Sequence, residues 1–363
     1  MQKIKLGEVG EIITGRTPST SIKNYWGNDF IFVTPLELYQ PFHINSSEKM
    51  ISNDGMNAIN LNRVGNISVL VGCIGAEIGN VGIVNKKCAF NQQINAITNF
   101  NENFNPYFIY YLLSGKKELF RKMAGRTTLP ILKKSDFENL EIEVPPLAEQ
   151  KKIGAFLYSL DEKISVNKKI NSTLEEMAWI IYLHKFFRNA GNGKLGDVII
   201  ENPKSTISVG DAKNSGGDFP FFTSGENILH WKEKLVDGRN IFVNTGGNAG
   251  INFYVGAAAY STDTWSITAE NLADYLYLFL HCIKVEIGKK FFKGTALKHL
   301  QKDLLREREI YIPSDAELEE FNRAVAPSFD MISKNLRENY RLAEMRNFLL
   351  PLLMNGQVSF KED

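Results

Sequence analysis

The strongest constraint on this chain is residues 147–190, a stretch of helix-forming residues with no proline and a single glycine, Gly154. Two prolines, Pro145 and Pro146, come directly before it, and proline suits the first position of a helix. The sequence therefore predicts one long helix over 147–190. At about 1.5 Å per residue this helix is on the order of 60 Å long, more than one small domain needs to cover its core.

Along this helix, seam residues recur at alternating steps of four and three, which is the 3.5-residue repeat of a two-helix contact. The centre of the seam is polar, because two asparagines occupy it. The seam residues are Ile153, Leu157, Leu160, Ile164, Asn167, Asn171, Leu174, Ala178 and Ile181.

The same pattern occurs again near the end of the chain, where Leu342–Met345 aligns with Leu174–Met177. Both central asparagines recur in phase. The second seam consists of Phe321, Val325, Ser328, Ile332, Asn335, Asn339, Leu342, Arg346 and Leu349. Near the start of the chain, Lys5–Val9 matches Lys194–Val198 at a larger offset, so the second copy is shorter by about 21 residues in its globular part.

The C-terminal helix is predicted over 314–356. Ser314 and Glu317 have the spacing of a capping box, in which each side chain satisfies a free backbone donor of the first turn. Pro327 falls inside the pattern, so we expect a kink or a break near Ala326.

The segments before the two helices combine short β-branched runs, turn-forming glycines and helical patches, which indicates mixed α/β domains. The fold class is therefore α+β, with each globular domain followed by a long helix. The predicted limits are 1–146 for the first domain, 147–190 for its helix, 191–313 for the second domain, 314–356 for its helix, and 357–363 for a C-terminal tail.

Composition sets broader bounds. A chain of 363 residues that is 44% hydrophobic can bury two cores. Its formal net charge of +1 argues against a protein that coats nucleic acid indiscriminately.

Cys73, Cys88 and Cys282 have neither metal-ligand spacing nor a disulfide pattern, which favours a reducing compartment. With no apolar stretch of membrane-spanning length and a polar N-terminus, we expect a cytoplasmic protein with no membrane contact.

Two motifs carry a family resemblance: Pro-Pro-Leu-x-Glu-Gln within residues 129–153 (LPILKKSDFENLEIEVPPLAEQKKI), and the tail LLPLLMNGQV at 349–358. In these stretches the chain resembles the specificity subunit of Type I restriction-modification systems. The similarity in organisation covers nearly the whole chain. The second helix begins differently, with Pro313-Ser314-Asp315-Ala316-Glu317, and lacks both the second proline and the Glu-Gln pair.

The resemblance implies two target-recognition domains separated by a pair of long antiparallel coiled-coil helices, related by a pseudo-twofold internal repeat. Each domain would read one half of a split double-stranded DNA target, and the helices would set the distance between half-sites, at about 5.4 Å per helical turn. The implied partners are two modification (methyltransferase) subunits and restriction/translocase subunits. S-adenosylmethionine, ATP and Mg are implied for those partners, and no cofactor or metal for this chain.

Catalytic motifs are weak in this sequence. Asn105-Pro106-Tyr107-Phe108 approaches the turn that holds the target amine in adenine methyltransferases, but it lacks the second proline and a partnering cofactor motif, so a turn that starts a helix is the better interpretation. The sequence has no phosphate-binding loop of the G-x-x-x-x-G-K-S/T type, and its five histidines show no ligand spacing. We expect a non-catalytic DNA-recognition subunit.

Residues that could contact DNA are cationic or forked hydrogen-bonding side chains on predicted turns and loops. Each has a rival interpretation as a solvated surface charge or, for Asn and Thr, as a turn former. In the first domain they are Arg16, Thr17, Lys86, Lys87, Asn91, Gln92, Gln93, Arg126 and Thr127. In the second domain they are Arg239, Asn244, Lys289, Lys290, Lys293, Thr295 and Lys298.

Two questions stay open at the level of sequence. The seam asparagines could fix the register of the two helices, with Asn167 and Asn171 near Asn335 and Asn339, or they could face a partner subunit. The chain as a whole could instead be a structural adaptor whose domains bind protein, or a stand-alone DNA methyltransferase, which the missing motifs disfavour.

Overall fold

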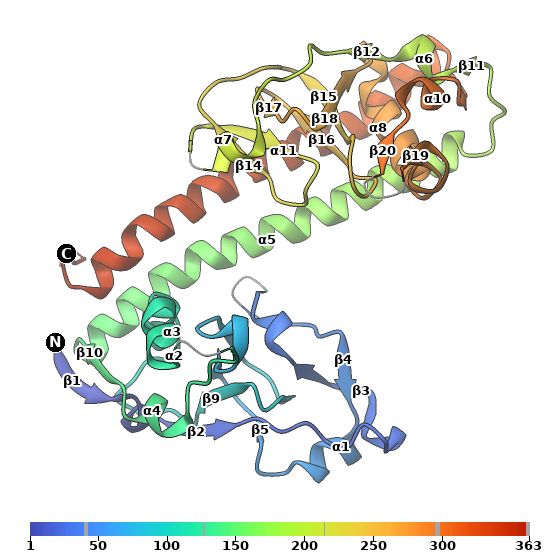
Figure 1. Ribbon diagram of the computed structural model, residues 1–363. Helices are drawn as coiled ribbons and strands as arrows, with labels where there is room; N and C mark the ends of the chain where they lie inside the picture. Colours follow the sequence, from blue (N-terminus) through green and yellow to red (C-terminus); the bar gives the residue numbers. More distant parts are fainter. Residues whose placement is uncertain (40–42, 126–127, 214, 295–297, 361–363) are drawn as a thin grey trace. The chain divides into compact units, whose positions relative to one another are not determined.

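The structure, a computed structural model, describes residues 1–363 except 40–42, 126–127, 214, 295–297 and 361–363. The chain divides into two compact units (Figure 1). Unit 1 comprises Met1–Ser165 and Arg341–Asp363, and unit 2 comprises Val166–Tyr340. The limits expected from the sequence follow the ends of the helices, whereas the compact units divide both long helices, because each globular part packs on a stretch of each helix.

In unit 1, an opening strand and 3-10 turn lead into two four-stranded sheets and a group of short helices. The elements are β1 (Gln2–Lys5), η1 (Leu6–Glu8), β2 (Glu11–Thr14), η2 (Lys23–Tyr25), β3 (Trp26–Val33), η3 (Pro35–Tyr39), β4 (Lys49–Ile51), α1 (Asn53–Ala58), β5 (Arg63–Val64), β6 (Ser68–Gly72), η4 (Gly75–Glu77), β7 (Val81–Val84), β8 (Cys88–Phe90), β9 (Ile94–Thr98), α2 (Pro106–Ser114), α3 (Lys117–Met123), α4 (Lys134–Glu138) and β10 (Glu141–Val144).

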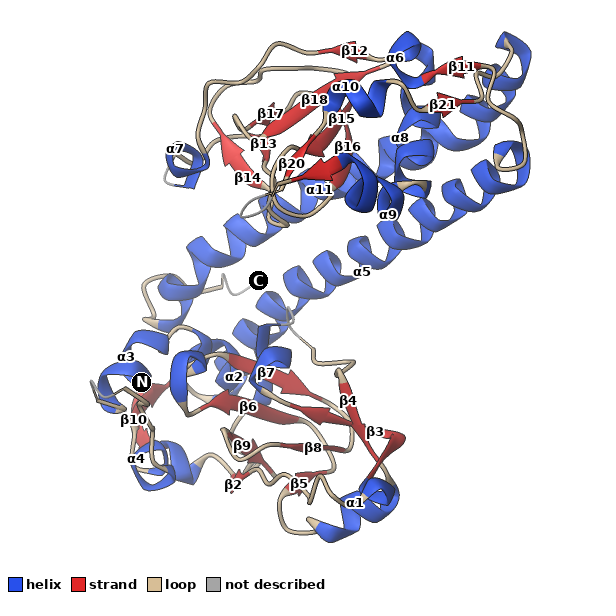
Figure 2. Cartoon of the chain, turned by 45° about the vertical axis from the view of Figure 1, so that its right-hand side comes forward, coloured by secondary structure: helices blue, strands red, loops and turns tan. Residues whose placement is uncertain are grey.

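The sheets of unit 1 have the orders β2-β9-β6-β7 and β4-β3-β8-β5, and β1 pairs antiparallel with β10 (Figure 2). The first sheet is antiparallel throughout, whereas β3 and β8 in the second run parallel. Every residue of β6, β7 and β9 is buried, which explains their β-branched, nearly continuous apolar sequences. Helix α2 adds Phe108, Ile109 and Leu113 to the core beside this sheet.

Unit 2 repeats this plan. They are β11 (Gly193–Lys194), α6 (Leu195–Val198), β12 (Ile200–Glu201), α7 (Val209–Lys213), β13 (Phe219–Phe222), β14 (Leu229–Trp231), β15 (Arg239–Asn244), β16 (Ile251–Val255), β17 (Ala259–Tyr260), β18 (Thr264–Thr268), η5 (Glu270–Leu272), α8 (Ala273–Cys282), α9 (Lys284–Glu286), the π-helix η6 (Ile287–Phe291), β19 (Phe292–Lys293), β20 (His299–Leu300), α10 (Lys302–Arg306) and β21 (Glu309–Ile310).

The strand orders reveal the internal repeat directly. The sheet β12-β18-β15-β16 has the antiparallel pairing of β2-β9-β6-β7, and the parallel pair β13–β17 matches β3–β8. The opening turns also correspond: the Lys5 N–H donates to Glu8 Oε1 at 2.8 Å, and the Lys194 N–H to Asp197 Oδ2 at 2.9 Å. Two mixed α/β globular parts built on one plan confirm the predicted fold class.

The long helices are α5 (Leu147–Phe186) and α11 (Asp315–Met354). At the start of α11, the Ser314 N–H donates to Glu317 Oε2 at 2.9 Å, and the Glu317 N–H donates back to Ser314 Oγ at 3.5 Å, as the capping-box spacing predicts. The break expected near Ala326 is wrong, because α11 runs unbroken through Pro327. Burial of Val325 and Phe329 in the core offsets the hydrogen bond that proline removes.

Within each unit the two helices run antiparallel. In unit 1, Asp161 of α5 pairs with Arg346 of α11. In unit 2, Asn167 Nδ2 donates to Asn339 Oδ1 at 2.9 Å, and Asn335 Nδ2 donates to Asn171 Oδ1 at 2.8 Å. The predicted contact between the asparagine pairs is therefore confirmed, and the asparagines bond one another across the helix pair.

The predicted seam residues fall into two groups by burial. Those that are buried are Ile153, Leu157, Leu160, Ile164, Asn167, Ala178, Phe321, Val325, Asn335 and Asn339. Those that are half-buried are Asn171, Leu174, Ile181, Ser328, Ile332, Leu342, Arg346 and Leu349. Near the end of α5, Tyr182 is buried beside the half-buried Ile181, so the buried stripe moves by one residue there.

Candidate nucleic-acid interface

In unit 1, the turn after β2 lies against the segment that joins β8 to β9. The Thr17 hydroxyl donates to Gln92 Oε1 at 2.8 Å, and Asn91 Nδ2 donates to Gln93 Oε1 at 2.9 Å. The Arg16 N–H is bonded to the end of β8, while its side chain and that of Gln92 are exposed. The structure thus brings together five of the predicted residues, with forked hydrogen-bonding groups of the kind that read base edges.

Lys86 and Lys87 lie on the turn between β7 and β8. Lys86 Nζ donates to the Asn45 carbonyl at 2.6 Å, and Lys87 Nζ lies 4.8 Å from the centroid of the Phe30 ring. Both lysines lie on a surface turn, where cationic side chains contact phosphates.

In unit 2, two of the predicted residues have side chains that are bonded to other groups of the protein. Arg239 Nη1 lies 2.6 Å from Asp274 Oδ1, and its Nη2 lies 2.6 Å from Asp330 Oδ1. Asn244 is buried, and its Nδ2 donates to the carbonyls of Ser224 and Asn248 at 2.9 and 3.1 Å. A structural role accounts for both side chains.

The four described lysines of the second predicted group are exposed: Lys289, Lys290, Lys293 and Lys298. Lys290 Nζ lies 3.0 Å from Glu286 Oε1, which is an ion pair. Lys293 is the backbone partner of His299 in the hairpin of β19 and β20. These lysines form a basic surface on η6 and that hairpin. Arg126, Thr127 and Thr295 lie outside the described residues.

Residues missed by the sequence analysis occupy the corresponding junction of unit 2. Because β12 and β18 match β2 and β9, the segments after β12 and before β18 correspond to those that carry Arg16 and Gln92 in unit 1. They contain Lys204, Thr262 and Asp263, and the Thr262 N–H donates to the Ile207 carbonyl at 2.9 Å. The signal in the sequence was the match between the two Lys-Leu-Gly segments. That match aligns these segments of unit 2 with their counterparts in unit 1 only once the strand register is known.

The motif Asn105-Pro106-Tyr107-Phe108 is the start of a helix. Asn105 Oδ1 accepts from the Phe108 N–H at 3.0 Å, and Pro106 occupies the first turn of α2. The asparagine side chain is therefore a helix cap. Among the residues that the structure describes, no group of three or more His, Cys, Asp or Glu side chains could hold a metal ion.

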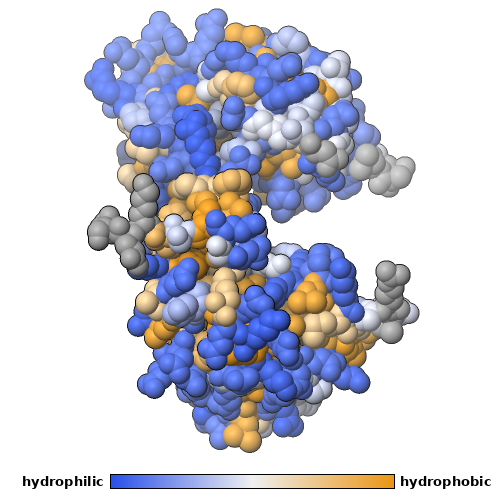
Figure 3. Space-filling model, turned by 90° about the vertical axis from the view of Figure 1, so that its left-hand side faces the viewer, coloured by the Kyte–Doolittle hydropathy of each residue, from blue (hydrophilic) through white to orange (hydrophobic). Residues whose placement is uncertain are grey.

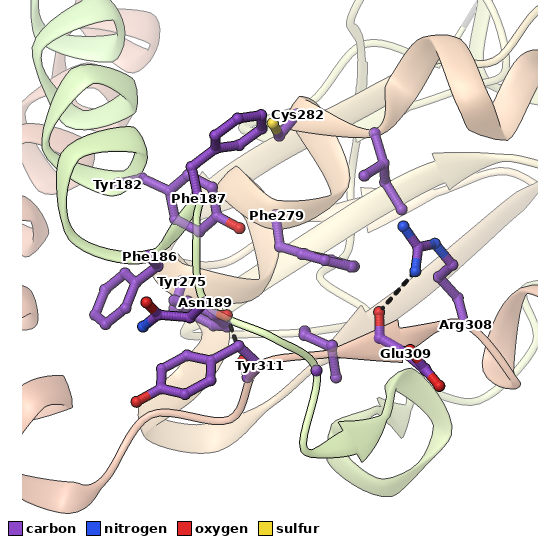
Figure 4. A pocket seen from close by; sticks show the side chains of 13 residues that line it. Tyr182, Phe186, Phe187, Asn189, Tyr275, Phe279, Cys282, Arg308, Glu309 and Tyr311 are labelled. Atoms are coloured by element: carbon purple, nitrogen blue, oxygen red, sulfur yellow. Dashed lines mark hydrogen bonds between the residues drawn. The ribbon is translucent and has the colours of Figure 1, made fainter.

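A cavity of about 170 Å³ in unit 2 lies where the end of α5 meets α8 and β21 (Figure 4). Aromatic side chains, including Tyr182, Phe186 and Tyr275, form its wall. Burial raises the pKa of Tyr182 and of Tyr275 above the ordinary tyrosine value, so neither hydroxyl ionises near neutral pH. Arg308 Nη1 donates to the Glu309 carbonyl at 3.2 Å. These groups pack the end of the helix and offer no activated base or nucleophile.

Both long helices also carry exposed apolar side chains. On α5, Met177 and Ile180 are 52% and 54% exposed, and on α11, Met345 and Phe348 are 42% and 69% exposed. The two pairs occupy equivalent positions in the aligned helices, so unit 2 and unit 1 each present one copy of the same surface. Apolar patches interrupt a mainly hydrophilic surface on the face drawn in Figure 3. No helix in the described part of the chain is both long and apolar enough to span a membrane.

Comparison with known proteins gives consistent matches. Residues 1–176 and 189–323 match the family model described as the type I restriction modification DNA specificity domain. The MjaIX specificity subunit of Methanocaldococcus jannaschii is 25% identical over 99% of this chain and 93% of its own length. The HindI specificity subunit of Haemophilus influenzae is 30% identical over 46% of this chain and 37% of its own length.

A solved structure has the same fold. The crystal structure of the type I restriction-modification S subunit from M. genitalium superposes with a TM-score of 0.68, over 100% of this chain and 96% of that one, at 14% sequence identity.

Proposed function

This chain belongs to the type I restriction modification DNA specificity domain family, and we infer that each of its two units reads one half of a split double-stranded DNA target. As a specificity subunit, the chain selects the DNA sequence on which a type I restriction-modification complex acts. The observation that carries the inference is the repeated sheet order with different side chains at the same junction, Arg16 and Gln92 in unit 1 and Lys204 and Thr262 in unit 2. Two such junctions suit two unlike half-sites.

The remaining chemistry is proposed to belong to partner subunits. Two modification subunits would supply S-adenosylmethionine and methylate an adenine in each half-site, and restriction/translocase subunits would use ATP and Mg. The chain itself would be a non-catalytic subunit that works in the cytoplasm. The helix cap at Asn105, the nearest approach to a methyltransferase motif, supports this division.

We propose that the modification subunits dock on the repeated apolar pairs, Met177 with Ile180 and Met345 with Phe348. Exposed apolar groups at the same positions of a repeat suit two copies of one partner. Leu157, Leu160 and Ile164 suit this role less, because they are buried within unit 1 and their replacement would disturb folding.

The function is tested by selecting binding sites from a random duplex pool, with the chain and the purified modification subunit together. Enrichment of a split site, two fixed segments separated by a spacer of constant length, is expected. No sequence selection by the assembled complex would contradict the proposal. Methyl transfer by this chain alone would contradict its non-catalytic role.

Docking is tested with Met177→Glu/Ile180→Glu and with Met345→Glu/Phe348→Glu, each in the full chain. Each double variant is expected to bind one modification subunit fewer, measured as the mass of the complex in solution, because a buried unpaired carboxylate is unfavourable. Lys168→Glu, at an exposed position on another face of α5, is the control. Full assembly by both double variants would refute this docking surface.

A further inference from the structure

A second cavity of unit 2, of about 290 Å³, lies where the chain leaves β12 beside the edge of β18. Its lining includes Lys204, Thr262, Trp265 and Lys302. The segments that carry Lys204 and Thr262 are the ones that match the Arg16 and Gln92 segments of unit 1. Its volume is close to the lower end for small-molecule sites, about 300 Å³, so it has room for a group the size of a nucleotide.

Trp265 lines the cavity and carries a buried indole donor. The side chain is 2% exposed, and its indole Nε1 has no hydrogen-bond partner among the described residues. An indole N–H can only donate, and a buried donor without an acceptor is unfavourable. The Trp265 ring, over which Lys302 lies, forms part of the cavity wall.

Two lysines, Lys204 and Lys302, line the cavity together with the carboxylates of Glu201 and Asp263. Lys302 Nζ lies 5.0 Å from the centroid of the Trp265 ring and 4.0 Å from Glu201 Oε2. Glu201 is also paired with Arg306, more closely than with Lys302. Lys204 forms no ion pair with any residue that the structure describes. Counted with Arg306, the cations Lys204, Lys302 and Arg306 exceed the carboxylates of Glu201 and Asp263 by one charge, which favours an anionic ligand.

Asp263 also lines the cavity, and it is exposed. Its backbone carbonyl accepts hydrogen bonds from the hydroxyls of Thr245, at 2.8 Å, and Ser224, so the position of the residue is fixed. A carboxylate next to a phosphate is unfavourable, but it is a good acceptor for the exocyclic amine of cytosine or adenine.

We propose that this cavity anchors one phosphate of the half-site read by unit 2, held by Lys204 and Lys302, and that the exposed Asp263 accepts a hydrogen bond from a base amine. The proposal rests on the function inferred above and names the residues that carry it out in the second half-site. The phosphate contact positions the DNA, and the Asp263 contact specifies the base.

The phosphate contact is tested with Lys204→Met/Lys302→Met in the complex with the modification subunit. Methionine keeps an unbranched apolar stem against Trp265, and unchanged thermal unfolding would verify the fold. The slope of log affinity against log salt concentration for the selected site is expected to become shallower by about 0.9, since the one phosphate held by the two lysines contributes about that much. Lys284→Met, at an exposed position on α9, is the matched control and should leave the slope unchanged. An unchanged slope in the double variant overturns the phosphate anchor.

The base contact is tested with Asp263→Asn, which exchanges an acceptor-only group for one that also donates. Selection from the random duplex pool should change the preferred base at one position of one half-site and leave the other half-site intact. An unaltered site overturns the role of Asp263. If the wild-type complex itself selects no split site, the proposed function fails; if it does and all variants behave like it, only this assignment of residues fails.

Discussion

Both carboxylate oxygens of Asp161 are engaged in the interior of unit 1. Its side chain is 3% exposed, Arg346 pairs with Oδ1, and the Tyr111 hydroxyl donates to Oδ2 at 2.7 Å. At the equivalent positions of the aligned helices, unit 2 has the buried pair Phe329 and Ala178. The two copies of the repeat therefore use opposite chemistries at one place in the helix pair. A buried ion pair is sensitive to the loss of one partner but replaceable by apolar packing.

Arg346→Met should lower the free energy of unfolding by about 3–5 kcal/mol, because Asp161 would keep a buried, uncompensated charge. Urea unfolding measures the change. The double variant Asp161→Leu/Arg346→Met should lose less than the single variant, since it removes the charge together with its partner. A double variant as unstable as the sum of the two single variants would contradict this explanation.

The stability of unit 2 should depend on pH through Asp274. Burial raises the pKa of Asp274 to about 6 against the lowering effect of Arg239, and Asp330 raises it further. Since the ordinary pKa is near 4, the folded state binds more protons than the unfolded state between about pH 4 and pH 6. Stability contributed by this residue therefore falls as pH rises through that window, by on the order of 3 kcal/mol.

Asp274→Asn, which resembles the protonated form, isolates this effect. Urea unfolding of both proteins from pH 4 to pH 7 should show the wild type losing stability relative to the variant as pH rises. Parallel curves would mean that Arg239 holds Asp274 ionised over the whole range.

The elements that sequence periodicity could predict are those whose pattern is long and local. Helices α5 and α11 were predicted nearly to their ends, and the asparagine contacts followed from matching two 3.5-residue repeats. The unbroken course of α11 through Pro327 was not predicted, because a local rule does not include the burial of Val325 and Phe329. The roles of single polar residues could not be predicted from the sequence either. Arg239 and Asn244 contact their partners only after distant segments pack together.

The asparagine pairs should act as coupled units. Asn335→Leu should lower the free energy of unfolding by about 1–3 kcal/mol, because Asn171 Oδ1 loses its donor. Asn171→Leu/Asn335→Leu should recover most of the loss or exceed the wild type, while admitting other helix registers and larger oligomers. Urea unfolding and light scattering measure the two effects. Losses that simply add, with no change in oligomeric state, would refute a role in register.

At the scale of the whole molecule, the central feature is the duplication of one plan. Its existence could be read from the sequence, because the joints of the repeat lie on regular elements with fixed spacing. The alignment of the globular parts between those joints could not be read from the sequence. Unit 2 has no described counterpart of α1 and β5, and the offset between the copies changes along the chain. Lys204 and Asp263 were missed for this reason, although they take the positions of residues that the sequence analysis named in unit 1.

The most direct test of the duplication is the exchange of residues 1–144 for the corresponding domain of another specificity subunit. The adenines methylated by the complete modification complex are then mapped by single-molecule sequencing of host DNA. If each unit reads one half-site, one half of the target changes to that of the donor protein and the other half stays as in the wild type. A change in both halves, or in neither, would contradict the assignment of one half-site to each unit.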